Sequence, residues 1–192
     1  MDRNRHETLM KTYTWKEAFA DANEGATLGK SPYQCFVGYC YDIGRGVKQD
    51  HKKAAYWYRK AAESGSADGM FNYALISESG VGTRRNTARA LRLYLQAANT
   101  GHLQAQSNLA VRYLDGRGAQ RNLGEGIRWL RKAARRGDDV AQYNLATAYL
   151  HGEGVTKSIR HAKTWLTKAA ENNHRKARLL IKRLEKAAFK AE

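Results

Sequence analysis

The chain has 192 residues, of which 42% are hydrophobic and 27% charged, and its formal net charge is +16. A single Pro and the lack of any polar low-complexity run exclude an obvious linker. No stretch of the sequence approaches the length of a membrane span.

The first predicted helix runs from about Thr12 to Asn23 and carries Trp15 and Phe19. The segment before it, Met1 to Lys11, is polar, and the first thirty residues lack the apolar core of a signal peptide. We therefore expect a cytoplasmic protein, or a periplasmic one if a leader had been removed.

A second helix is predicted from Ser31 to Asp42, with Pro32 tolerated in its first turn. Cys35 and Cys40 lie five residues apart on this helix, about 140° around its axis. Their Cβ atoms therefore point apart, and we expect two reduced, packed thiols instead of a disulfide.

One pattern then repeats every 36 residues without insertion or deletion. Its leading positions, each followed four and five residues later by a pair of Ala residues, are Trp57, Leu93, Trp129 and Trp165. A fixed period of this length indicates one supersecondary unit, copied so that neighbouring copies bury each other's apolar faces.

Each repeat carries signals that begin and end a helix, named helix B here. A Gly-x-Gly turn precedes it, starting at Gly44, Gly80, Gly116 and Gly152. A capping side chain follows six residues later, at Asp50, Asn86, Asn122 and Ser158. A residue suited to the left-handed conformation ends it, at Gly65, Gly101, Gly137 and Asn173. Helix B is therefore predicted at about 51–63, 87–99, 123–135 and 159–171.

Small and apolar residues at helical spacing predict a second helix per repeat, helix A, at about 67–79, 103–115 and 139–151. Short loops make neighbouring helices antiparallel. A last helix, Arg175 to Ala188, starts in the helix A phase and then loses it. The predicted fold is an all-α, right-handed solenoid of antiparallel helix pairs. Its expected parts are an N-terminal segment and capping helix (1–30), four repeats (about 31–66, 67–102, 103–138 and 139–174) and a C-terminal capping helix (175–192).

These residues resemble the Sel1-like repeat family, a relative of the tetratricopeptide repeat. The W-x-x-K-A-A-x-x-G pattern of that family runs from Trp57 to Gly65, and its A-x-x-x-L-A-x-x-Y pattern, followed by G-x-G-V, runs from Ala141 to Val155. Three residues depart from the pattern, namely Gly126 in an Ala position, Leu93 in place of Trp and Ser77 in place of Tyr. Each departure predicts a locally looser contact.

The resemblance implies a non-catalytic module that binds another protein, in a bacterium. Its broad version is an adaptor, and the preferred specific version is an inhibitor or immunity protein against a secreted toxin. Some Sel1-like proteins carry a Cys pair in each repeat and have been linked to periplasmic life and β-lactam hydrolysis. This chain lacks those pairs, so neither property is carried over. The six His residues show no metal-ligand spacing, and we expect no enzyme activity, no metal and no cofactor.

Helix A is expected to line a concave groove that holds the partner. The candidate groove residues are Cys35, Tyr39, Phe71, Asn72, Leu75, Ser107, Asn108, Val111, Tyr143, Asn144, Thr147, Leu179 and Arg183. Phe71 and Tyr143 are natural anchors because they are large and rigid. The three Asn residues form a ladder of amides, which the resemblance to tetratricopeptide repeats implies for binding a peptide backbone or terminal carboxylate. The alternative is that each Asn bonds a neighbouring helix and stabilises the stack.

Charge is unevenly distributed along the chain. Residues 1–42 hold 5 Lys and Arg against 6 Asp and Glu, a net charge of −1, whereas residues 43–192 hold 29 against 12, a net charge of +17. The candidate basic surface lies on helix B and the loop before it, with Arg84, Arg85, Arg89, Arg92, Arg121, Arg128, Arg131, Lys132, Arg135, Arg136, Lys163 and Lys168. This surface either binds an acidic protein or a nucleic acid, or it only keeps the stack soluble. Nucleic acid ranks last because the aromatic residues occupy core positions of the repeat.

Overall fold

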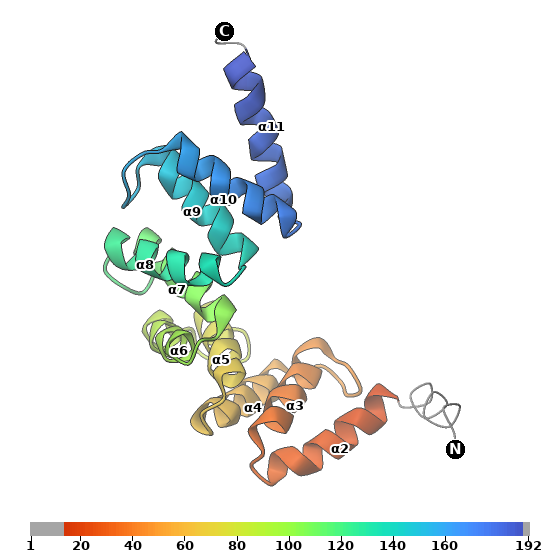
Figure 1. The fold of residues 1–192 in the computed structure, drawn as a ribbon. Helices are drawn as coiled ribbons and strands as arrows, with labels where there is room; N and C mark the ends of the chain where they lie inside the picture. Colours follow the sequence, from red (N-terminus) through yellow and green to blue (C-terminus); the bar gives the residue numbers. More distant parts are fainter. Residues whose placement is uncertain (1–13, 190–192) are drawn as a thin grey trace, which may run out of the picture. The chain divides into compact units, whose positions relative to one another are not determined.

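The structure is a computed structural model that describes residues 14–189, and all regular structure within that range is helical (Figure 1). The helices are α2 (Trp15–Thr27), α3 (Ser31–Ile43), α4 (His51–Glu63), α5 (Ala67–Ser79), α6 (Thr87–Asn99), α7 (Leu103–Asp115), α8 (Leu123–Arg135), α9 (Asp139–His151), α10 (Ile159–Glu171) and α11 (Arg175–Phe189). The chain divides into two compact units between Leu93 and Tyr94, within α6.

Helices that follow one another in the sequence pack together within each unit. In the first unit α3 contacts α2, α4 and α5, and α4 also contacts α5. In the second unit α7 packs on α8, α8 on α9, α9 on α10 and α10 on α11. This sequential pairing confirms the all-α solenoid, in which each helix pair buries its apolar face against the next.

The predicted helix signals are confirmed at the residue level. The side chains of Asp50, Asn86, Asn122 and Ser158 each accept a hydrogen bond from a backbone amide of the first helical turn. All four predicted stops adopt positive φ, with values of 84° at Gly65, 98° at Gly101, 92° at Gly137 and 65° at Asn173. The bounds of α4 to α10 therefore coincide with the predicted helices B and A.

The first helix differs from its prediction, because α2 spans Trp15–Thr27 instead of about 12–23. It begins with a capping box, in which the Glu17 carboxylate accepts from the Thr14 amide at 2.7 Å and the Thr14 hydroxyl accepts from the Glu17 amide. The helix continues through Gly25, where an added Cβ would lie 2.7 Å from the Tyr33 ring, and Gly29 then turns the chain at φ 80°. The start of the predicted range, Thr12, lies outside the described residues.

Two of the three departures from the repeat pattern are not loose contacts. A Cβ at Gly126 would lie 2.6 Å from the Leu114 side chain, so Leu114 already fills that space. Ser77 is fully buried; its hydroxyl donates to the Tyr73 carbonyl at 2.6 Å and accepts from Arg89 Nε at 3.0 Å. The expectation of a looser contact was wrong at both positions because a long neighbouring side chain replaces the missing volume.

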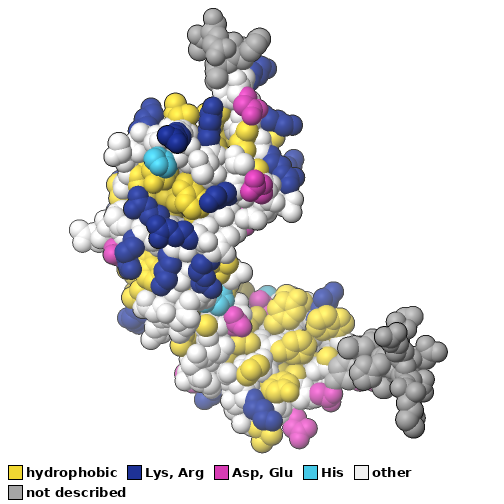
Figure 2. Space-filling view, in the orientation of Figure 1, with side chains coloured by type: hydrophobic (Ala, Val, Ile, Leu, Met, Phe, Trp, Pro, Cys, Tyr) yellow, Lys and Arg dark blue, Asp and Glu magenta, His cyan; other side chains and the backbone are white. Residues whose placement is uncertain are grey.

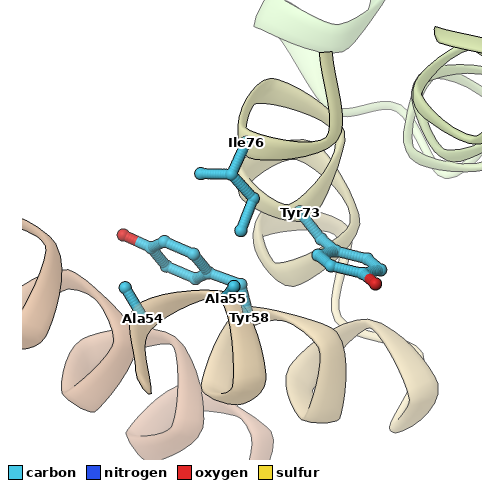
Figure 3. Packing of buried hydrophobic residues seen from close by; sticks show 5 residues of the cluster. All are labelled: Ala54, Ala55, Tyr58, Tyr73 and Ile76. Carbon is cyan, nitrogen blue, oxygen red and sulfur yellow. The ribbon is translucent and has the colours of Figure 1, made fainter. Parts of the chain in front are cut away.

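Each unit has its own buried cluster. In the first unit, Tyr73 and Ile76 of α5 lie over Ala54, Ala55 and Tyr58 of α4 (Figure 3). In the second unit, the largest fully buried side chains include Trp129, Leu109, Leu130, Leu145 and Leu166. These residues occupy the recurring positions of the repeat, so the core follows the 36-residue pattern.

The close approach of α4 and α5 depends on a helical glycine. A Cβ at Gly69 would lie 2.6 Å from Ala61 Cβ and 2.7 Å from the backbone of Ala61 and Ala62. We expect Gly69→Ala to lower the free energy of unfolding by about 1–3 kcal/mol, because the helices must separate. The matched control is Gly124→Ala, whose Cβ would meet only Asn122 Oδ1 at 3.5 Å, and which should leave stability unchanged or raise it by up to about 1 kcal/mol. Denaturant titration of both variants checks this, and equal effects would contradict it.

Candidate partner-binding surface

In the first unit the helix A surface is formed by α3 and α5, which contact each other. Tyr39 and Leu75 are its most open candidate residues, with 40% and 39% of their surface exposed. Phe71 and Asn72 are half-buried. This part of the surface therefore offers an aromatic, an aliphatic and an amide side chain to a ligand.

Both cysteines are free, which confirms the expectation that they form no disulfide. Cys40 is fully buried, and Cys35 Sγ lies 3.4 Å from Ser66 Oγ. Burial raises the pKa of the Cys35 thiol above its ordinary value. A thiol with a raised pKa is a poor nucleophile at neutral pH, so Cys35 contributes packing and not reactivity.

In the second unit the candidate residues lie on three helices. They are Asn108 and Val111 on α7, Tyr143, Asn144 and Thr147 on α9, and Leu179 and Arg183 on α11. All are at least partly exposed, and Leu179 is half exposed. The Thr147 hydroxyl donates to the Asn144 carbonyl at 2.8 Å within the helix, so its proton is already used.

The predicted groove residue Ser107 is placed differently. It is buried, with 5% of its surface exposed, and its hydroxyl oxygen has no hydrogen-bond partner among the described residues. Ser107 occupies the position taken by Phe71 and Tyr143 in the neighbouring repeats, where the larger side chains reach the surface. A short side chain at this position stays below the surface, so Ser107 does not line it.

An open pocket of about 410 Å³ lies between the start of α9 and the start of α11. The ring of Tyr143 stacks on the imidazole of His174, with centroids 4.6 Å apart and 14° between the planes. This stacking holds the Tyr143 ring as a flat wall beside Asn144 and two cations, Arg175 and Lys176. The lining residues are Asp139, Val140, Tyr143, Asn144, Asn173, His174, Arg175 and Lys176. An aromatic wall, an amide and two cations suit an extended segment that bears a carboxylate.

The three Asn residues of the predicted ladder do not join neighbouring helices. Asn108 Nδ2 donates to the Gln104 carbonyl at 2.9 Å, and Asn108 Oδ1 accepts from Arg112 Nη1 at 3.2 Å, both within α7. Within residues 14–186 the side-chain amides of Asn72 and Asn144 make no hydrogen bond. Stabilisation of the stack therefore does not explain these amides, and two of them are available to a ligand.

The side chains that do join neighbouring helices are Gln residues that the sequence analysis missed. Gln34, Gln106 and Gln142 are buried, and each donates from Nε2 to the carbonyl of a residue near the end of the preceding helix. Each Oε1 also accepts from the residue that follows the next helix B, at 3.3 Å from Ser64 and Arg136 and at 3.1 Å from Asn172. Their spacing of 72 and 36 residues is the signal that could have found them.

This Gln contact predicts a measurable stability effect. Gln142→Leu removes two hydrogen bonds, the one donated to the Ala134 carbonyl and the one accepted from Asn172, although the Ala134 carbonyl keeps its bond from the Gly137 amide. We expect a loss of about 1–3 kcal/mol in the free energy of unfolding. Gln104→Leu, at an exposed position of α7, should leave it within about 0.5 kcal/mol. Thermal and denaturant unfolding of both variants checks this prediction, and equal losses of stability in the two variants would contradict it.

The candidate basic residues are not equivalent. In the first unit Arg89 donates to Ser77, Thr83 and the Arg84 carbonyl, whereas Arg84, Arg85 and Arg92 are exposed. In the second unit the structure uses three of them internally. Arg121 donates to the Leu114 carbonyl, Arg128 forms a two-point pair with Glu125 and lowers the pKa of that carboxyl, and Arg136 donates to the Gly101 carbonyl.

The remaining candidate residues of the basic surface in the second unit are exposed. Arg131, Lys132 and Arg135 lie on α8, and Lys163 and Lys168 lie on α10. Lys132 and Lys168 each lie over a Trp ring, at 4.9 Å from the ring centroid. Figure 2 shows Lys and Arg side chains gathered over the α8 part of the second unit. Residues 94–192 hold 19 Lys and Arg against 8 Asp and Glu, so this unit carries most of the net positive charge.

Two further properties bear on the class of protein. In the described part of the chain no group of three or more His, Cys, Asp or Glu residues is placed to hold a metal ion. Within the same residues, no helix is both long and apolar enough to cross a membrane.

Stacked helix pairs with a fixed 36-residue period and varied side chains on helix A define an α-solenoid of the repeat-scaffold class. The Sel1 repeat family model matches the chain four times, over residues 31–66, 67–102, 103–138 and 139–174. The chain therefore belongs to the Sel1 repeat family, a family of non-catalytic repeat scaffolds that generally mediate protein–protein interaction. No curated protein sequence matches the chain.

Several solved structures are similar to this chain. A Sel1 repeat protein from Oxalobacter formigenes is 30% identical with a TM-score of 0.79, and the match covers 88% of this chain and 49% of that one. A protective antigen present in uropathogenic Escherichia coli strains, with an SLR fold, is 34% identical with a TM-score of 0.78, covering 80% of this chain and 33% of that one. Helicobacter pylori cysteine rich protein B shares the fold at 20% identity and a TM-score of 0.55, over 67% of this chain and 95% of that one. The chain thus spans half or less of the length of the first two.

Proposed function

We propose that this chain is a non-catalytic bacterial protein-binding module that holds one protein partner against its helix A surfaces. Its specific role is that of an adaptor or of an inhibitor or immunity protein against a toxin, acting in the cytoplasm. The observation that carries the proposal is the α9–α11 pocket, where Tyr143 and Asn144 lie beside Arg175 and Lys176. Two solved structures that are 30% and 34% identical to this chain come from bacteria, which supports a bacterial setting.

The chemistry of the pocket supports an acidic segment as the part of the partner that is held. Asn144 offers both a donor and an acceptor to a peptide backbone, and its amide is not bonded within the described residues. Arg175 and Lys176 are exposed cations that outnumber the one lining carboxylate, Asp139. In the first unit, Phe71 and Asn72 repeat the pairing of an aromatic residue with an amide.

Capture of the partner from the native host, followed by a binding assay with the two purified proteins, tests this function. The proposal expects a 1:1 or similarly fixed complex that persists at 300 mM salt, because apolar anchors contribute most of its affinity. Phe71→Ala should weaken it by about tenfold or more, whereas Leu28→Ala, an exposed apolar residue after α2, should not. A complex that ignores Phe71 and dissociates between 50 and 200 mM salt would contradict it.

The second candidate function is polyanion binding through the basic surface of the second unit. The exposed residues Arg131, Arg135 and Lys163 favour it, because none of them is paired with a carboxylate in the described residues. Binding of this kind falls steeply with salt. Changing the three residues together to Glu should abolish polyanion binding and leave a groove-held partner in place. Retention of nucleic acid by the triple variant would exclude this second function.

A further inference from the structure

We propose that the second unit contains a phosphate-binding pocket between α8 and the loop that joins α9 to α10. The pocket is an open hollow of about 940 Å³ with lining residues from α8, the end of α9, the loop and the start of α10. It is separate from the α9–α11 pocket, with which it shares no lining residue. The pocket is independent of the proposed protein-binding surface, and it shares only Arg131 with the basic surface of the second candidate function.

Two cations and a histidine meet in this pocket from three different elements. Arg131 comes from α8, Lys157 from the loop and His161 from the first turn of α10. No Asp or Glu is among the lining residues. Of the neighbouring acids, Glu125 on α8 is already paired with Arg128 at 2.7 Å, and Glu153 is an exposed loop residue that does not line the pocket. The lining of the pocket therefore carries a net positive charge, which favours an anion.

A chain of side-chain contacts fixes the positions of these groups. The imidazole of His161 stacks on the ring of Tyr149, with centroids 5.0 Å apart, and the Tyr149 hydroxyl accepts from Arg131 Nη2 at 3.4 Å. Ser158 Oγ accepts from the His161 amide and lies 2.9 Å from His161 Nδ1. When the Ser158 hydroxyl donates to Nδ1, the ring proton of neutral His161 is on Nε2, which is then a donor for a ligand.

The donor set matches a phosphate group better than a carboxylate. A phosphate carries up to two negative charges and three free oxygens, and it accepts hydrogen bonds from several directions at once. The guanidinium of Arg131 provides a planar pair of donors and the ammonium of Lys157 a compact charge. The hydroxyl of Thr156 adds a neutral donor on the loop side.

The start of helix B carries different residues in the other repeats. At the position of His161 they have Lys53, Arg89 and Glu125. Lys53 lies over the Tyr41 ring at 5.2 Å, and Arg89 donates into its own loop, so each cation is used by the fold. Glu125 places a negative charge at this position of the third repeat. Only the fourth repeat therefore combines a histidine here with cations that face the pocket.

Titration of the full chain with inorganic phosphate, followed by amide chemical shifts, tests the site. We expect saturable shifts confined to residues 152–161 and to the part of α8 around Arg131. Arg131→Gln combined with Lys157→Gln should weaken phosphate binding by about tenfold or more, because hydrogen bonds to charged groups are lost. The matched control, Arg135→Gln with Lys163→Gln, removes the same two charges from the same unit outside the pocket and should change the affinity by less than about twofold.

A second arm uses a phosphoserine peptide to identify the source of the phosphate. Tighter binding of the peptide than of inorganic phosphate, lost in the Arg131 and Lys157 variant, assigns the site to a phosphorylated protein, and equal binding assigns it to free phosphate. Equal losses in the pocket variant and the control variant would overturn the proposal, since they indicate only a general basic surface. Shifts spread over all Lys- and Arg-rich helices, or none up to 50 mM phosphate, would overturn it as well.

Discussion

Replacement of Trp129 by Ala is expected to lower the free energy of unfolding by about 3–5 kcal/mol, the usual cost of removing a large aromatic side chain from a core. Trp129 lies on α8 with 1% of its surface exposed, and no other fully buried side chain in the described chain is larger. Its removal leaves a cavity between helix pairs, which the neighbouring repeats cannot close without moving. Denaturant titration monitored by circular dichroism measures the loss.

The repeat provides the control for this substitution. Trp57 and Trp165 occupy the same phase but are only partly buried, and Lys168 lies over the Trp165 ring. We expect Trp165→Ala to cost clearly less than Trp129→Ala, since less apolar surface returns to water. Equal losses at the two positions would show that burial in the second unit does not follow the structure described above.

Replacement of Tyr143 by Ala is expected to weaken binding of the protein partner by about 2–4 kcal/mol, the range of an aromatic hot spot. The ring is held by stacking on His174 and forms the flat wall of the α9–α11 pocket. Tyr143→Phe keeps the ring and should retain most of the affinity. Calorimetry with the purified partner measures the affinity of the unsubstituted protein, of Tyr143→Ala and of Tyr143→Phe.

A tyrosine on a helix B surface separates this effect from a general loss of aromatic surface. Tyr56 lies on α4 with 45% of its surface exposed. Tyr56→Ala should leave the affinity within about 0.5 kcal/mol of the unsubstituted protein. Binding in the groove would be contradicted if Tyr56→Ala weakened the complex as much as Tyr143→Ala, or if Tyr143→Phe weakened it as much as Tyr143→Ala.

The helix bounds could be predicted from the sequence because every signal recurs at a fixed spacing. Asn122 and Gly137 are ordinary residues alone, but their recurrence in phase with Asp50 and Gly65 identifies a start and a stop in each repeat. The first helix is in the same register, because α2 (Trp15–Thr27) lies 36 residues before α4 (His51–Glu63) and Gly29 lies 36 residues before Gly65. The prediction of its bounds was wrong because Asp21 stands where the repeat has Trp57, so the leading position of the pattern is missing there. Its start is fixed by the capping box of Thr14 and Glu17, and Thr14 lies 36 residues before the cap Asp50.

The site was harder to predict because side-chain contacts do not follow the period as closely as the backbone does. Ser107 is in phase with Phe71 and Tyr143, yet its short side chain is buried. Arg128 and Arg136 are in the same basic run as Arg135, yet Arg128 is paired with Glu125 and Arg136 donates to the Gly101 carbonyl, whereas Arg135 makes no hydrogen bond or ion pair with the described residues. The period therefore predicts the backbone position of a side chain, whereas contacts with neighbouring side chains determine whether it is available to a ligand.

Hydrogen exchange of the complex with the captured partner, compared residue by residue with the free chain, shows which helices the partner covers. We expect slowed exchange on the helix A elements, with the largest change on α9 and the start of α11, and little change on α4, α8 and α10. Protection confined to α8 and α10, with α5 and α9 exchanging as in the free chain, would contradict it.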